Sequence, residues 1–142
     1  MKINKLRVVL DTNVILVSIS KKSKFRPIFD AILNGQIELV VSNELISEYI
    51  EVIERKSNNL VAHNIGEALL NLGNVIKVEI NFNWHLIESD KDDNKFVDCY
   101  VAGNSDILVT SDKHFDILKQ VNFPKIRILD IESFLSLIKE NF

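Results

Sequence analysis

Two aspartates that follow strongly apolar segments are the residues best placed to do chemistry. The run Arg7–Leu10 leads into Asp11, and the run Ile107–Thr110 leads through Ser111 into Asp112. Short aliphatic runs of this kind predict buried strands of a parallel sheet. Ligands bind outside the carboxyl ends of such strands, where the strand order reverses. Because two carboxylates in one crevice repel each other, the pattern predicts a divalent metal site.

The elements that must carry these acids alternate between strands and helices. We expect strands at residues 6–10, 37–41, 75–80, 107–110 and 126–129. We expect helices at about 25–34, 43–56, 59–72, 93–103, 113–119 and 131–140. Five strands alternating with helices predict an α/β fold, a three-layer α/β/α sandwich with a central parallel sheet and right-handed crossovers.

Composition limits the class of protein. A chain of 142 residues with 46% hydrophobic and 26% charged residues predicts one soluble globular domain covering residues 1–142. No apolar run approaches the roughly 20 residues of a membrane span, and a lone Cys99 suits the reducing cytoplasm. The net charge of −3 does not indicate nucleic-acid binding. It does not exclude it, because bound metal would neutralise part of the acidic charge.

Glu48 is a third candidate acid. The helix expected at 43–56 has an apolar face, and Glu48 lies at the border of that face. Taken alone, it would be an ordinary exposed glutamate. However, the helix follows a strand that ends at Val41, so it begins at the same carboxyl edge as the two aspartates.

An acidic run at residues 88–94 precedes the helix expected at 93–103. Asp93 lies at the start of this helix, where its charge favours the positive end of the helix dipole. Asn94 and Asp98 are four residues apart and therefore share one flank. An aspartate inside a helix is unfavourable by propensity, which makes Asp98 a candidate for function. Asp90 and Asp92 are expected to serve as loop and cap residues.

A basic cluster precedes the helix expected at 25–34. With Ser23 inside it and Pro27 after it, the segment predicts a loop that enters the helix at about Phe25 or Arg26. It is either a solvated loop or a contact for a phosphate backbone beside the site. Its members are Lys21, Lys22, Lys24 and Arg26.

Four acidic motifs, in order along the chain, resemble the PIN-domain family. They are residues 8–14 (VVLDTNV), the Glu48 helix, residues 92–98 (DDNKFVD) and residues 109–112 (VTSD). The resemblance covers essentially the whole chain and is closest to the VapC-like branch, the toxin components of toxin–antitoxin pairs. It implies a cytoplasmic endoribonuclease that uses Mg²⁺ or Mn²⁺ to hydrolyse RNA phosphodiester bonds. It also implies an RNA substrate, a small antitoxin partner and a homodimer.

The resemblance assigns Asp11, Glu48 and Asp112 to acidic positions, with Thr110 as a polar helper. The remaining acidic position of the family pattern falls on Asn94, so a neighbouring residue must supply the negative charge. We favour Asp98, on the same flank as Asn94, with Asp93 in reserve. The expected catalytic residues are therefore Asp11, Glu48, Asp98 and Asp112, and the expected metal ligands are these four and Asp93.

Carboxylate oxygens without a His or Cys cluster suit Mg²⁺ or Mn²⁺. Since His63, His85 and His114 lie in unrelated segments, we interpret them as structural or surface residues. Two alternatives stay open. A metal-dependent phosphohydrolase with an aspartyl nucleophile usually needs a second aspartate where Asn13 stands. A catalytically weak PIN scaffold would only bind RNA or a partner protein.

Overall fold

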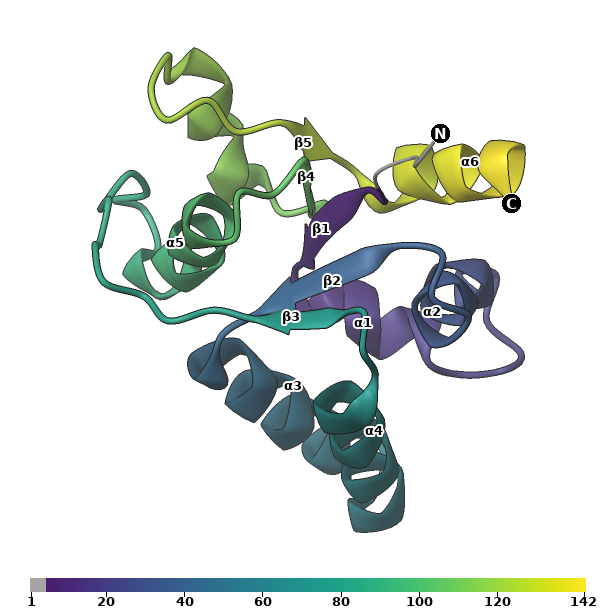
Figure 1. The fold of residues 1–142 in the computed structure, drawn as a ribbon. Helices are drawn as coiled ribbons and strands as arrows, with labels where there is room; N and C mark the ends of the chain where they lie inside the picture. Colours follow the sequence, from purple (N-terminus) through teal and green to yellow (C-terminus); the bar gives the residue numbers. More distant parts are fainter. Residues whose placement is uncertain (1–4) are drawn as a thin grey trace.

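The computed structural model describes residues 5–142 and contains a five-stranded parallel sheet in the order β3-β2-β1-β4-β5 (Figure 1). Its strands are β1 (Arg7–Leu10), β2 (Glu38–Val41), β3 (Val75–Lys77), β4 (Ile107–Val109) and β5 (Ile128–Leu129). All five expected strands are present. The two edge strands are shorter than expected, because β3 ends early in irregular chain and β5 begins late after an irregular segment.

Helices cover both faces of the sheet and complete the predicted three-layer α/β fold. They are α1 (Thr12–Ser18), α2 (Arg26–Leu33), α3 (Asn43–Lys56), α4 (Asn59–Asn71), α5 (Asn94–Ala102) and α6 (Ile131–Asn141), with 3-10 helices η1 (Lys91–Asp93) and η2 (Lys113–Gln120). Helix α5 lies on one side of the central strands, while α1, α2 and α6 lie on the other (Figure 1). In the described chain, no helix has both the length and the apolar character needed to cross a membrane.

Helix α1 was not expected from the sequence. It begins directly after Asp11 and places Asn13 at the surface. Its residues Val14 and Ile15 are buried in the core. Their β-branched side chains have low intrinsic helix propensity, so the helix depends on tertiary packing.

The order of the strands reverses at β1, which pairs with β2 on one side and β4 on the other. The three central strands are buried on both faces, as in other parallel sheets. The Asp11 amide extends the pairing, because it donates to the Val109 carbonyl at 3.0 Å. Asp11 therefore lies at the switch point where open α/β sheets bind ligands.

Helix α3 is fixed to this edge at its beginning and in its middle. The Ser42 hydroxyl accepts the Leu45 amide at 3.2 Å, which caps the helix. One turn after Ile46, the fully buried Tyr49 donates its hydroxyl to the Leu10 carbonyl at the end of β1. The neighbouring residue, Glu48, is thereby held close to Asp11.

The segment between β3 and η1 is irregular, and its Phe82 and Trp84 form an exposed aromatic cluster with Phe123, which follows η2. Phe82 and Phe123 are 63% and 80% exposed. Both meet the ring of Trp84 edge-on, with centroids 4.8 and 5.8 Å away.

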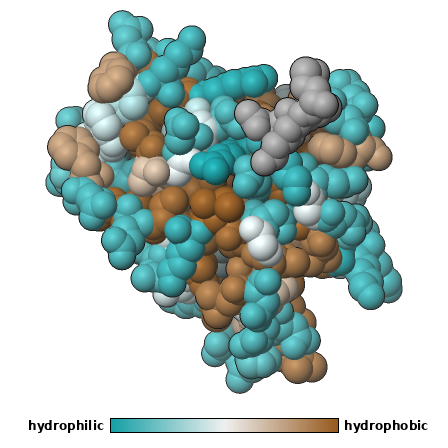
Figure 2. All heavy atoms as spheres, in the orientation of Figure 1, coloured by the Kyte–Doolittle hydropathy of each residue, from teal (hydrophilic) through white to brown (hydrophobic). Residues whose placement is uncertain are grey.

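The face drawn in Figure 2 is mostly hydrophilic, with hydrophobic side chains exposed among the polar ones.

Candidate metal centre

Asp11 occupies the centre of the site. It is only 9% exposed, and its Oδ2 accepts the Thr110 hydroxyl at 2.8 Å. Burial raises the pKa of Asp11, and the nearby charges of Asp112 and Glu48 raise it further, while the hydrogen bond from Thr110 opposes them. Three of the predicted acids are therefore close enough to interact, as their positions at one sheet edge predicted.

Thr110 links the two aspartates that follow β1 and β4. Its hydroxyl donates to Asp11 and accepts the Asp112 amide at 3.1 Å. Asp112 in turn caps η2, because its Oδ1 accepts the His114 amide at 2.9 Å. The expected polar helper is thus a residue that fixes the spacing of the two acids.

Glu48 reaches the site from α3, with a partner for each oxygen. Its Oε2 accepts the Thr12 hydroxyl, and its Oε1 lies 2.5 Å from Lys95 Nζ. The Lys95 side chain is 7% exposed and also contacts Asp92 Oδ2 at 2.7 Å. The sequence interpretation missed Lys95. Its ammonium group is the main positive charge against Glu48, and together with Thr12 it holds that carboxylate in place.

Asp93 supplies the remaining acid of the cluster. Burial raises its pKa to about 6, with further increases from Asp90, Asp112 and Asp11, while the contact with His114 opposes them. Although Asp93 precedes α5, its side chain makes no capping hydrogen bond. Its Oδ2 is buried and has no hydrogen-bond partner. Asp93 therefore faces the other acids instead of serving the helix.

The structure favours Asp93 over Asp98, the residue that the sequence favoured, as the remaining acid of the crevice. Asp98 Oδ1 accepts the Trp84 amide at 2.9 Å. Burial raises the pKa of Asp98, and the charge that acts on it is His85 rather than the acids of the site. Asp98 is thus a structural acceptor for the segment that precedes η1.

Asn94 shows which way the flank that it shares with Asp98 faces. Its amide group donates to the Ile87 carbonyl and accepts the Ile87 amide, both at 2.9 Å. Asn94 and Asp98 do share one flank of α5, but this flank faces residues 84–87 rather than the acidic crevice. An amide is required at position 94 because only a side chain with both a donor and an acceptor can pair with the main chain in this way.

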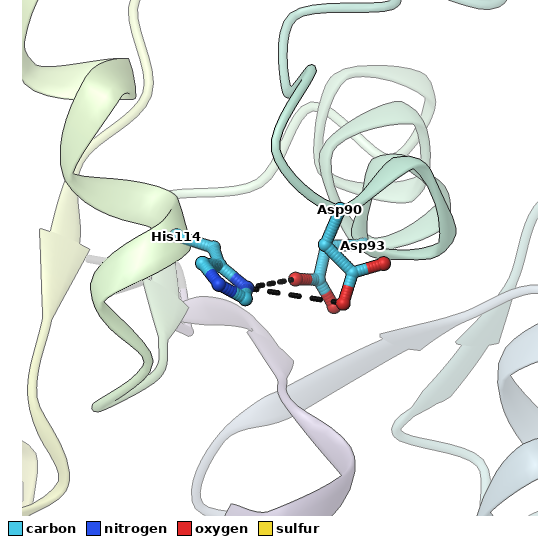
Figure 3. Close-up of side chains that lie close together, drawn as sticks. All are labelled: Asp90, Asp93 and His114. Atoms are coloured by element: carbon cyan, nitrogen blue, oxygen red, sulfur yellow. Dashed lines mark ion pairs between the residues drawn. The ribbon is translucent and has the colours of Figure 1, made fainter.

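His114 was interpreted as a surface or structural residue, yet the structure places it at the acids. Its Nδ1 lies 3.4 Å from Asp93 Oδ2, 3.4 Å from Asp112 Oδ1 and 3.8 Å from Asp90 Oδ2. Figure 3 shows the imidazole pointing from the start of η2 toward Asp90 and Asp93. The signal was available in the sequence, because His114 follows Asp112 by two residues at the same sheet edge.

Two of the four members of the basic cluster form ion pairs with acidic side chains. Lys24 Nζ lies 2.8 Å from Glu132 Oε1, and Arg26 Nε lies 2.8 Å from Asp30 Oδ1. Arg26 also donates to the Ile19 carbonyl. The loop enters α2 at Arg26, as expected. A role in phosphate contact remains a prediction.

The residues of the crevice fit a divalent cation. Glu48, Asp93 and Asp112 bring three carboxylates from three separate segments into electrostatic range of Asp11. Neighbouring acidic charges raise the pKa of Asp11 and of Asp93, and one buried oxygen of Asp93 accepts no hydrogen bond. Mg²⁺ and Mn²⁺ prefer oxygen ligands such as carboxylates. A bound cation would also offset the repulsion between the negative charges.

We expect the metal-free protein to become more stable as the pH falls from about 7 toward 4. Asp93 titrates at about 6 in the folded chain and near the ordinary 3.8 in the unfolded chain, so the folded state binds more protons in this window. Thermal unfolding in EDTA should give a higher Tm at pH 5.5 than at pH 7.5. Asp93→Asn should flatten this dependence; an equal pH slope in the variant would contradict the assignment.

Comparisons with known proteins agree with the fold. A family model described as PIN domain matches residues 7–114. VapBC2 of Rickettsia felis, solved with a DNA fragment from its promoter, is similar at 13% identity with a TM-score of 0.60, over 88% of this chain and 98% of that one. DNA-bound VapBC of Salmonella typhimurium is similar at 18% identity with a TM-score of 0.58, over 89% of this chain and 98% of that one. No curated protein sequence matches.

Proposed function

The chain belongs to the PIN-domain family, and from that premise we propose that it is an endoribonuclease dependent on Mg²⁺ or Mn²⁺. The convergence of Asp11, Glu48, Asp93 and Asp112 at the switch point of the sheet carries the proposal. The VapBC structures support the fold in which such a site is built.

Each residue of the crevice has a task under this proposal. A divalent ion, when bound, supplies activation of water and stabilisation of charge on the departing oxygen of a phosphodiester. Asp11, Asp93 and Asp112 would hold the ion. Thr110 keeps Asp11 and Asp112 at a fixed spacing. Glu48 is already held by Thr12 and Lys95, so we assign it to orienting water or substrate.

The substrate class is tested by comparing RNA with DNA. Purified protein should be incubated with a mixed-sequence, end-labelled RNA and with the DNA of the same sequence, each in Mg²⁺ or Mn²⁺. We expect internal cleavage of the RNA, giving several shorter products. Cleavage of the DNA alone, or of neither strand at any metal concentration tested, would overturn the proposal.

We further propose that the protein is a VapC-like toxin of the cytoplasm that binds a small antitoxin. The structural likeness to VapBC assemblies supports the assignment as a toxin. The free, buried Cys99 supports a reducing compartment such as the cytoplasm. The product of the neighbouring reading frame is the partner to test. Co-purification with this chain, together with loss of RNA cleavage in the complex, is the expected result.

We expect a homodimer in solution. The basis is the family resemblance, and the exposed hydrophobic side chains at Val17, Leu60 and Leu70 are available for such contacts. Size-exclusion chromatography with light scattering at micromolar concentration should give about twice the 16.3 kDa chain mass. A uniform species of 16.3 kDa would contradict it.

A further inference from the structure

We propose that His114 is a metal ligand through Nδ1, at a position that it forms with Asp90 and Asp93, and that it biases the centre toward Mn²⁺ over Mg²⁺. The inference rests on the proposed metal-dependent function and adds a nitrogen donor to a site otherwise described by its carboxylates. One ligand atom from each of Asp90, Asp93 and His114 lies within 4.8 Å of the others. Figure 3 shows the three side chains directed at one another.

The spacing of these atoms is close to that of ligands on one ion. Adjacent ligands of an octahedral ion are about 3 Å apart and opposite ligands about 4 Å apart, for bonds near 2.1 Å. His114 Nδ1 lies 3.4 Å from Asp93 Oδ2 and 3.8 Å from Asp90 Oδ2. Both distances fall between the adjacent and the opposite ligand spacings, so these atoms are spaced as ligands of one ion would be.

The donor atoms also have free lone pairs. Asp93 Oδ2 is buried and accepts no hydrogen bond. Asp90 uses Oδ1 to accept the Asp92 amide at 3.1 Å, which leaves Oδ2 directed at the imidazole. The local fold thus orients Asp90 and leaves one of its oxygens for an ion.

The imidazole changes the metal preference. Mg²⁺ strongly favours oxygen ligands, whereas transition ions accept imidazole nitrogen. A site of two carboxylates and one imidazole should therefore distinguish Mn²⁺ from Mg²⁺ more strongly than carboxylates alone. Because Asp93 interacts with both Asp11 and His114, the two parts of the centre share this residue.

The test is pulsed electron paramagnetic resonance of Mn²⁺ bound to the full chain, which detects ¹⁴N of a coordinated imidazole. His114→Gln is the variant, and His63→Gln, an exposed site on α4, is the matched control. We expect ¹⁴N modulation in the wild type and in His63→Gln, and its loss in His114→Gln. Calorimetry should show Mn²⁺ affinity falling about tenfold in His114→Gln, with a smaller change for Mg²⁺.

Absence of ¹⁴N modulation in the wild type, or its persistence in His114→Gln, would overturn the inference. Circular dichroism of His114→Gln checks its fold, and the side chain is 46% exposed, so we expect the fold to be retained. If the modulation is absent while Mn²⁺-dependent RNA cleavage persists, only the role of His114 fails. If Mn²⁺ does not bind the wild type at all, the proposed function fails as well.

Discussion

Asp11→Asn should reduce RNA cleavage by at least about 100-fold, because it removes a charged ligand from the middle of the acidic crevice. Asp11 is nearly buried between Thr110 and the other acids, and burial and like charges already raise its pKa. Removing the charge relieves that repulsion. The Tm of the metal-free variant should therefore equal or exceed that of the wild type, measured by thermal unfolding in EDTA.

Asp116→Asn is the matched control for this variant. The same aspartate-to-asparagine change is made at Asp116 on η2, outside the crevice. The Asp116 side chain is 62% exposed and pairs with Lys119. We expect wild-type cleavage and wild-type Mn²⁺ affinity. If Asp11→Asn cleaved RNA as fast as Asp116→Asn, Asp11 would not be the central ligand.

The second prediction is that alanine substitutions at Asp93 and Asp98 have opposite effects. Asp93→Ala should abolish Mn²⁺ binding and cleavage while raising the stability of the metal-free protein, because it removes a carboxylate whose pKa is raised to about 6. Asp98→Ala should retain cleavage but lower the free energy of unfolding by about 1–3 kcal/mol, because the Trp84 amide loses its acceptor.

Calorimetric Mn²⁺ titration and urea unfolding in EDTA measure the two effects separately. The sequence alone favoured the other order, with Asp98 as the ligand and Asp93, at the start of the helix, in reserve. A stable, cleaving Asp93→Ala protein beside an Asp98→Ala protein that folds but binds no Mn²⁺ would restore that earlier assignment.

The sheet and most of its acids could be predicted because they depend on local pattern. Aliphatic runs that end in Asp11 and near Asp112 determine both the strands and the edge at which the carboxylates lie. Glu48 could be added because its helix begins after β2 at the same edge. These inferences need only the rule that parallel strands present their carboxyl ends together.

The remainder of the site depends on contacts between distant segments. Helical periodicity correctly paired Asn94 with Asp98, but it could not show that this flank faces residues 84–87. The segment from β3 to η1 has no regular pattern, so its path was not predictable. Lys95 and His114 belong to the site only because α5 and η2 bring them against Glu48 and Asp93.

The most direct measurement is RNA cleavage by the purified protein in excess EDTA, followed by addition of Mn²⁺ in excess of the chelator. Under the proposed function, the acidic crevice supports cleavage only when a divalent ion neutralises its carboxylates. We therefore predict no cleavage in EDTA and full recovery once Mn²⁺ is restored, with no recovery in Asp11→Asn. Undiminished cleavage of the RNA in EDTA would contradict the account.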